Sequence, residues 1–373
     1  MKQLWLFAWV CLVTACGQAG KPSSPEAGRQ DTIRYAKGFT IQRHEAYILA
    51  EIADPWDSVR LLQRYVLVDR NRPLPDNLPP GTIVRTPLED VVVYSSVHAA
   101  IIDELRETGR IAGVCEPQYM DLLAIQDGLR DGRIADLGLS TAPNIEKMID
   151  IGAGCIIASP LQNVDYGPAG KLGIPIIEGA DYMEAHPLGR AEWGRFYGLL
   201  LGKPEMADSI FRATEERYLR LRSLAQTAAR RPTVFPEKRY GSIWYVPGND
   251  SYVAHLFRDA GAAYVFDYIP GQGSTPLSFE TVLDRAIHAD IWLIKYNQTN
   301  DLTCAGLRTE YAPYENFDAF KNRRIYACHT GRTPYYEESP IHPDYLLRDL
   351  IHIFHPELLP DYSPRYYHAI KDE

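Results

Sequence analysis

A long helical passage divides this chain into two parts with the same pattern, and this division most constrains the fold. Residues 188–229 are helical almost throughout by their spacing, with one break at Gly202-Lys203-Pro204. Pro204 suits the first turn of a new helix. From there apolar residues recur at intervals of three and four, namely Met206, Ile210, Phe211, Tyr218, Leu221 and Leu224. A helix of roughly 25 residues spans on the order of 38 Å, enough to cross between two lobes or to lie along one domain as an ordinary amphipathic helix.

Short apolar segments alternate with helical ones on both sides of this passage. The segments before it are 91–94, 111–114, 155–158 and 174–177, and those after it are 242–246, 264–266, 291–294 and 325–327. Apolar strands between helices predict parallel sheets covered on both faces. We therefore predict an α/β fold of two Rossmann-like lobes joined by one long interdomain helix. Residues 33–187 form the N-terminal lobe, 188–229 the helical linker and 230–373 the C-terminal lobe.

The segment before the first apolar strand has a different pattern. Between Phe39 and Val68 apolar residues stand two apart, as in Phe39 and Ile41, which is the periodicity of strands. Residues 72–81 carry four prolines and predict an irregular loop.

The first residues predict where the protein works. A lone Lys2, an apolar stretch over 4–13 and the sequence Val13-Thr14-Ala15-Cys16 are typical of a secretory signal peptide over residues 1–15. The last four residues resemble a lipobox, which makes Cys16 the lipidated residue and 16–32 a flexible tether. One alternative is an ordinary cleaved signal peptide. The other is a membrane-spanning helix, but the apolar stretch over 4–13 is too short to cross a bilayer. We expect a periplasmic protein anchored to a cell membrane by its N-terminal lipid.

The charge of the chain limits its possible partners, and the spacing of its cysteines limits metal sites and disulfides. The formal charge of -9 and the lack of any block of lysines or arginines argue against nucleic acid and favour a small ligand or a basic protein surface. Apart from Cys11 in the signal and Cys16, the cysteines are Cys115, Cys155, Cys304 and Cys328. Their spacing fits no CxxC pattern, and a disulfide between Cys304 and Cys328 is left open.

The order of several segments resembles the iron-complex and cobalamin periplasmic binding-protein family of ABC importers, whose lobes are joined by one rigid helix. The resemblance covers about residues 81–353. The matching segments are Ser95-Ser96-Val97-His98, Asn144-Ile145-Glu146, Ala191-Glu192-Trp193 and Phe279-Glu280 ahead of Ala289-Asp290-Ile291-Trp292. It implies a monomer that binds a ferric siderophore, haem or cobalamin and delivers it to an ABC permease. The strands at 39–68 and the Tyr-rich end at 362–367 lie outside the family's usual pattern.

The resemblance also implies two docking residues. In that family one glutamate on each lobe contacts arginines of the permease, and Glu146 and Glu280 occupy the matching places. A pair of separated carboxylates would steer docking by charge. The alternative is that each glutamate only complements the dipole of its own helix.

We expect the ligand where the carboxyl ends of both sheets face each other across the cleft. The candidate ligand-binding residues are Ser95, Ser96, His98, Gln118, Tyr119, Gln162, Trp244, Tyr245, Tyr252, Tyr268, Tyr296 and Arg332. Aromatic side chains there can stack on a flat macrocycle or aromatic chelate, or simply belong to the core. His98 and His329 do not complete a set of metal ligands, so we predict no metal site and no cofactor. Anionic catecholate chelates need several arginines, and Arg332 is the one candidate.

Two other classes of protein have a similar length. A two-lobed transferase would need a Gly-rich phosphate loop, and Gly271-Gln272-Gly273-Ser274 is a poor candidate because no strand leads tightly into it. The chain also lacks GxSxG and HExxH, so we predict that it is not an enzyme. A free-standing scavenger of haem or corrinoid would share the cleft but not the docking glutamates.

Overall fold

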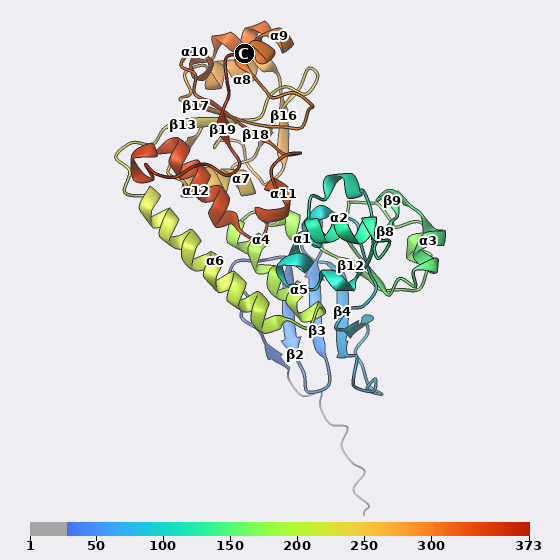
Figure 1. The fold of residues 1–373 in the computed structure, drawn as a ribbon. Coiled ribbons are helices and arrows are strands. Elements are labelled where there is room, and N and C mark those ends of the chain that lie inside the picture. Colours follow the sequence, from blue (N-terminus) through green and yellow to red (C-terminus); the bar gives the residue numbers. More distant parts are fainter. Residues whose placement is uncertain (1–27) are drawn as a thin grey trace, which may run out of the picture.

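The computed structural model describes residues 28–373, which form two lobes joined by the helix α6 (Pro204–Ala225). Figure 1 shows the N-terminal lobe in blue and green, the C-terminal lobe in orange and red, and α6 running between them. The predicted signal peptide, Cys16 and most of the predicted tether lie outside the described residues. The fold is α/β with two parallel sheets, as the sequence predicts.

The N-terminal lobe is built on a five-stranded parallel sheet. Its strand order is β12 (Ile176–Glu178), β11 (Cys155–Ala158), β6 (Val91–Val93), β7 (Ile111–Val114) and β8 (Ala135–Asp136). The helices are α1 (Ser96–Glu104), α2 (Leu123–Arg130) and α3 (Ile145–Asp150), and β9 (Gly138–Leu139) pairs with β10 (Ala142–Pro143). The central strands are buried on both faces, because helices and loops cover the sheet from both sides.

A second, mostly antiparallel sheet belongs to the same lobe. It consists of β1 (Arg29–Gln30), β2 (Phe39–Arg43), β3 (Ile48–Ala53), β4 (Leu61–Asp69) and β5 (Thr82–Thr86), of which only β4 and β5 run parallel. The alternation seen in the sequence places one face of this sheet inward. Phe39 meets Trp193 edge-on, with 4.9 Å between the ring centroids. The predicted strands are therefore part of the N-terminal core.

The C-terminal lobe repeats the parallel arrangement. Its sheet has the order β15 (Ala263–Tyr264), β13 (Thr233–Pro236), β17 (Ile291–Tyr296), β18 (Ile325–His329) and the antiparallel edge strand β19 (His368–Ala369). The helices are α7 (Tyr252–Asp259), α8 (Phe279–Ala286), α9 (Cys304–Glu310), α10 (Asp318–Lys321), α11 (Tyr335–Glu338) and α12 (Pro343–Phe354). The strand predicted at 242–246 is β14 (Trp244–Pro247), which pairs with β16 (Ser274–Leu277) outside the parallel sheet.

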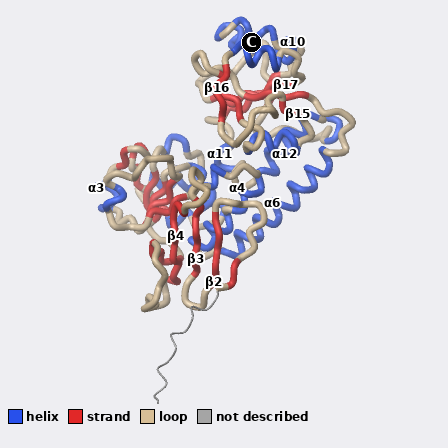
Figure 2. Tube along the Cα trace, turned by 180° about the vertical axis from the view of Figure 1, so that it is seen from behind, coloured by secondary structure: helices blue, strands red, loops and turns tan. Residues whose placement is uncertain are grey.

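The helical passage is three helices rather than two, because α4 (Pro187–Glu192) and α5 (Gly194–Leu200) precede α6. α6 begins at Pro204 and contributes to both hydrophobic cores. Ala207, with Met206 and Ile210, packs in the N-terminal core. Tyr218, with Leu219 and Leu221, packs in the C-terminal core. The helix therefore joins the lobes and is not a helix of one domain; Figure 2 shows the same arrangement from behind.

The lobes also touch beside α6. Ile341 follows α11 in the C-terminal lobe but is packed in the N-terminal core, 8% exposed. The next residue, His342, places Nε2 3.3 Å from Glu104 Oε1 on α1 and Nδ1 3.2 Å from Thr214 Oγ1 on α6. The hydrogen bond from His342 lowers the pKa of Glu104.

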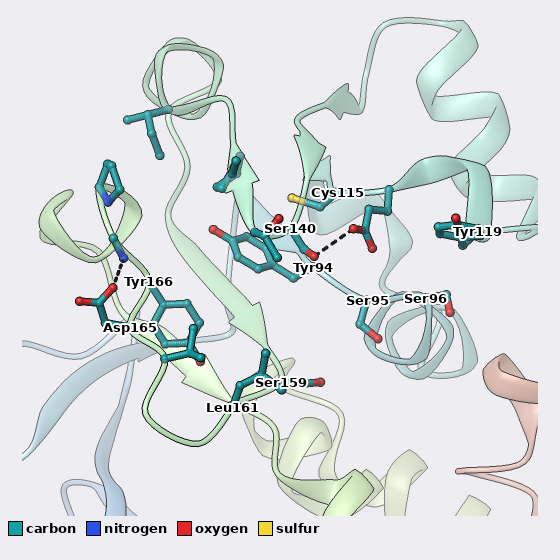
Figure 3. Close-up of a pocket in the computed structure, with 18 of the residues that line it drawn as sticks. Tyr94, Ser95, Ser96, Cys115, Tyr119, Ser140, Ser159, Leu161, Asp165 and Tyr166 are labelled. Atoms are coloured by element: carbon teal, nitrogen blue, oxygen red, sulfur yellow. Dashed lines mark hydrogen bonds between the residues drawn. The ribbon is translucent and has the colours of Figure 1, made fainter. Parts of the chain in front are cut away.

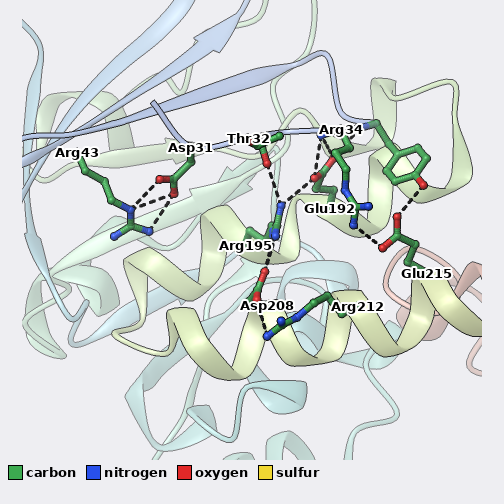
Figure 4. A network of polar contacts seen from close by, with 10 residues as sticks. Asp31, Thr32, Arg34, Arg43, Glu192, Arg195, Asp208, Arg212 and Glu215 are labelled. Atoms are coloured by element: carbon green, nitrogen blue, oxygen red, sulfur yellow. Dashed lines mark hydrogen bonds and ion pairs between the residues drawn. The ribbon is translucent and has the colours of Figure 1, made fainter. Parts of the chain in front are cut away.

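Residues 34–38, which we call the N-terminal strap, are held by two buried carboxylates. Glu192 accepts the backbone N–H groups of Arg34, Tyr35 and Ala36 at 2.7 to 3.1 Å, and Glu184 accepts those of Lys37 and Gly38. Figure 4 shows that Glu192 also accepts a hydrogen bond from the guanidinium of Arg195, and that Arg34 forms an ion pair with Glu215 of α6. Tyr35 packs against the C-terminal core. The strap therefore contacts both lobes.

The Tyr-rich end closes over α12 through one carboxylate. Asp349, fully buried, accepts the hydroxyl of Tyr362 at 2.6 Å and the backbone N–H groups of Arg365, Tyr366 and Tyr367 at 2.9, 2.6 and 3.1 Å. The tail then continues into β19. The Tyr-rich end thus leads into the strand that completes the C-terminal sheet.

The four cysteines of the described residues are free and buried. The open question of a disulfide between Cys304 and Cys328 is answered in the negative by this structure. Burial of Cys155 raises the pKa of its thiol to about 12, as expected for a small side chain in an apolar strand.

Candidate ligand-binding cleft

The carboxyl ends of β6, β7 and β11 surround a cavity of about 730 Å³ in the N-terminal lobe, which we call the N-lobe pocket. The loops after the parallel strands form its wall, as expected for an open α/β sheet. Figure 3 shows Tyr94, Tyr166 and Ser140 directed into it. All its lining residues belong to this lobe.

Aromatic and hydroxyl groups dominate the N-lobe pocket. The rings of Tyr94 and Tyr166 meet edge-on with centroids 6.5 Å apart. The Tyr166 hydroxyl donates to Glu178 Oε1 at 3.0 Å, whereas the buried Tyr94 hydroxyl has no hydrogen-bond partner among residues 28–373. Burial raises the pKa of both phenols, so they stay protonated as donors.

A second concavity, the interlobe groove, is lined by both lobes. It consists of two adjoining cavities of about 570 Å³ each that share Glu184 and Gln272. One cavity lies mainly against the C-terminal lobe, at Arg239, Tyr245 and Lys295. The other lies between the N-terminal strap and His255. We call the N-lobe pocket the N-lobe half of the candidate cleft, and the cavity beside Arg239, Tyr245 and Lys295 its C-lobe half; the two share no lining residue.

The C-lobe half of the cleft carries positive charge at the ends of two strands. Lys295, near the end of β17, pairs with Glu237, which follows β13 with a φ of 67°. Burial opposes the charge on Lys295, but the Glu237 carboxylate raises the pKa of Lys295 overall. The guanidinium of Arg239 lies 3.8 Å from the centroid of the Tyr311 ring, and its buried Nε has no hydrogen-bond partner within the described chain. Arg239 therefore places at the lining of the groove a positive charge that makes no ion pair with the rest of residues 28–373.

Five of the sequence-predicted ligand residues line these cavities. Ser95, Ser96 and Tyr119 line the N-lobe pocket, and Ser95 also caps α1 by accepting the N–H of Val97 at 3.2 Å. Tyr245 and Tyr252 line the interlobe groove. These residues therefore line two separate cavities, one within the N-terminal lobe and one between the lobes.

Two predicted residues are buried in the cores, and the prediction is wrong for them. Trp244 is fully buried beside Phe235 and Trp292, and its Nε1 donates to the carbonyl oxygen of Pro236. His98 is 1% exposed, with Nε2 3.5 Å from Asp181 Oδ1, and lines none of these cavities. Both side chains are directed into the packed interior of their lobes. The residue type alone does not show this direction.

The other predicted residues lie outside the lining of these cavities. Gln118 lines a separate hollow on the N-terminal lobe. Tyr268 lies under Arg285, Tyr296 packs beside His329, and Arg332 pairs with Asp301 at 2.6 Å. Gln162 is exposed.

The two predicted docking glutamates occupy equivalent helix starts. Glu146 is in the first turn of α3, which Asn144 caps, and Glu280 is in the first turn of α8, which Ser278 caps. Both are exposed. Hydrogen bonds from its own N–H and from Ser278 lower the pKa of Glu280. Each glutamate is therefore free to meet a basic partner.

Several cleft residues are not among the individual ligand residues predicted from the sequence, namely Tyr94, Glu116, Asp165, Tyr166, Arg239 and Lys295, although the loops that begin at Glu116 and Lys295 were expected around the cleft. Tyr94 directly follows β6, and Lys295 ends the apolar part of β17. A polar or aromatic residue at the end of an apolar strand was thus an available signal. Nothing comparable marked Arg239 or Asp165.

Two lobes, a central helix shared by both cores and a cleft between them define a two-lobed binding protein. The profile of the family described as "Periplasmic binding protein" matches residues 91–330. The chain belongs to this family.

Curated relatives and solved structures are consistent with this membership. Two uncharacterized lipoproteins of Methanocaldococcus jannaschii are similar to this chain. One is 28% identical over an alignment that covers 79% of this chain and 73% of the relative, and the other is 25% identical over 91% of this chain and 87% of the relative. A possible iron-binding protein from Staphylococcus epidermidis has a TM-score of 0.57 at 17% identity, covering 72% of this chain and all of its own. A haem-binding protein from Roseiflexus sp. RS-1 has a TM-score of 0.53 at 18% identity, covering 73% and 99%. The structural likenesses show a shared fold.

Two observations concern the described residues only. No helix within 28–373 is long and apolar enough to cross a membrane. The same range contains no group of three or more His, Cys, Asp or Glu residues arranged to hold a metal ion.

Proposed function

We propose that this chain is the lipid-anchored substrate-binding protein of an ABC importer, and that it captures an iron chelate, such as a siderophore or haem, or cobalamin. The observation that carries the proposal is the pair of cavities, namely the N-lobe pocket of about 730 Å³ and a groove lined by both lobes. Cavities of roughly 300–1,000 Å³ are typical of small-molecule sites. The rings of Tyr94, Tyr166 and Tyr245 offer stacking surfaces for a flat or aromatic chelate.

The names of similar proteins support the ligand class. Solved structures of the same fold include a Fe3+-hydroxamate transport protein from Saccharomonospora viridis and haem-binding proteins, one of them in complex with two haems. The ligand of this chain is then a metal chelate that the protein holds by its organic part. Tyrosine hydroxyls, serines and Arg239 supply the polar contacts.

Membrane attachment follows from the N-terminal sequence. Cys16 would carry the lipid, residues 1–15 would be removed, and the tether would let the lobes reach a permease from the outer face of the cytoplasmic membrane. The lipoprotein names of the Methanocaldococcus relatives support this.

Permease docking is assigned to Glu146 and Glu280. Both are exposed, both open a helix, and they stand on different lobes, so a permease with two basic sites would contact both at once. Glu146→Ala and Glu280→Ala should each slow uptake and leave ligand affinity nearly unchanged. Glu205→Ala is the matched control, because Glu205 is an exposed glutamate in the first turn of α6 with no docking role. Full transport by the double variant would remove the docking assignment.

Native mass spectrometry of the protein purified from its own host tests the ligand class. A co-purifying mass that matches a ferric chelate, haem or corrinoid supports the proposal, and a nucleotide or sugar would contradict it. A bound chelate in a protein whose deletion leaves permease-dependent uptake unchanged would favour a free-standing scavenger.

A further inference from the structure

The N-lobe pocket contains negative but no positive side chains. Among its lining residues within 28–373 are the carboxylates of Glu116 and Asp165, and none is a lysine, arginine or histidine. Its other polar groups are hydroxyls, including those of Tyr94, Ser95 and Ser140. A ligand group that enters this pocket therefore meets a negative potential with no compensating cation.

Neither carboxylate is neutralised by the protein part that the structure describes. Glu116 Oε1 accepts the Ser140 hydroxyl at 3.1 Å, and Asp165 Oδ1 accepts the N–H of Gly167 at 2.9 Å. Both bonds come from neutral donors. No ion pair to either residue is formed within residues 28–373, so no lysine, arginine or histidine of this range offsets either carboxylate.

The C-lobe half of the cleft has the opposite character. Lys295 and Lys238 are each paired with a carboxylate, whereas the Arg239 guanidinium makes no ion pair within the described chain and lies on the Tyr311 ring. The two halves therefore differ in charge, and the difference has a direction across the cleft.

We propose that Glu116 and Asp165 select the charge of the ligand: the N-lobe pocket accepts a neutral or cationic part of the chelate and disfavours an anionic one. The inference rests on the proposed function, because it concerns the chelate held in the same cleft. Glu116 and Asp165 act by charge at close range and not by a specific hydrogen bond.

Probes that differ in charge alone test the proposal. The ferric complex of desferrioxamine B has a terminal ammonium, its N-acetyl derivative is neutral there, and its N-succinyl derivative carries a carboxylate. Cobalamin, its monocarboxylate and its aminoethyl amide form a second such series, and haem with its propionate diamide a third. Affinities are measured by calorimetry or intrinsic fluorescence for the wild-type chain and for the double variant Glu116→Gln, Asp165→Asn.

In the double variant the ratio of cationic to anionic affinity should fall about three- to tenfold, while the neutral probe binds as before. The change should shrink at high salt. The control variant Glu45→Gln, Asp76→Asn removes the same charge from exposed positions outside the pocket lining, and its ratio should match the wild type. If the double variant does not fold, the same affinity ratio is measured for Glu116→Gln and Asp165→Asn separately.

The outcomes separate the two proposals. An unchanged ratio in the pocket variant, or an equal change in the control, overturns charge selection and leaves the importer proposal intact. Failure of all three chelate series to bind in any charge form overturns the proposed function itself.

Discussion

Replacement of Asp349 by asparagine should release the C-terminal tail. The Asp349 carboxylate accepts four donors from residues 362–367, two on each oxygen. Asparagine keeps one acceptor oxygen and turns an NH₂ group toward the other two donors. Because a lost hydrogen bond to a charged group costs about 1.5 kcal/mol or more, the tail should lose about 3 kcal/mol of local stability.

Hydrogen exchange measured by mass spectrometry reports this loss directly. A loss of about 3 kcal/mol corresponds to roughly a hundredfold faster exchange of the backbone amides in the tail peptide, if opening is local. Asp361→Asn is the control, because Asp361 lies in the same segment, is exposed and makes no hydrogen bond within the described chain.

A small effect would refute this reasoning. If Asp349→Asn leaves tail exchange within about threefold of the wild type, the tail is held by the packing of Tyr366 and Tyr367 against Tyr335 and not by the carboxylate. Loss of exchange protection throughout the C-terminal lobe would instead mean that the tail does not open by itself.

Three further predictions concern acid stability, lobe motion and the anchor. Burial lowers the pKa of His186 to about 4 from 6.5, so between these values the unfolded chain binds a proton that the folded chain does not, and stability falls as the pH falls. His186→Asn keeps an acceptor for the Leu188 N–H and should shift acid unfolding, followed by near-UV circular dichroism, to lower pH; identical curves would contradict this. Ligand binding should change the radius of gyration by less than about 1 Å out of roughly 20 Å in small-angle scattering, because α6 belongs to both cores; a large decrease would make α6 a hinge. Cys16→Ser should give soluble or uncleaved protein in cell fractionation, and membrane retention of a cleaved variant would contradict the lipid anchor.

Much of the fold could be predicted from periodicity, because burial on both faces leaves a continuous apolar run. β11 and β17 are such runs and lie where the sequence places them. The segment of β14 was also predicted to be a strand of the parallel sheet, but it pairs with β16 outside that sheet. Its alternating pattern, with Trp244 inward and Tyr245 outward, fits either location, because sequence does not specify the partner strand.

The cleft could be predicted in position but not in detail. The carboxyl-end rule correctly brought Ser95 and Tyr119 to a cavity. The rule wrongly placed Trp244 at the cleft. Aromatic residues occur both in clefts and in cores, so the residue type does not show which of the two a given side chain occupies. The charge difference between the two halves depends on which carboxylates are paired, and pairing between residues as distant as Lys238 and Glu310 is a property of the folded chain.

The N-terminal strap has a mechanical consequence for a chain tethered at that end. Tension on residue 28 first meets β1, which pairs with β2, and the ion pair of Asp31 with Arg43, and it then reaches residues 34–38. There five consecutive N–H groups bound to Glu192 and Glu184, and the contact of Arg34 with Glu215, resist the pull together. Because these anchors belong to α4, its preceding loop and α6, the load that they carry enters the molecule at the junction of the lobes. A pull at residue 28 is therefore shared between the second sheet of the N-terminal lobe and the helices α4 and α6 at the junction of the lobes.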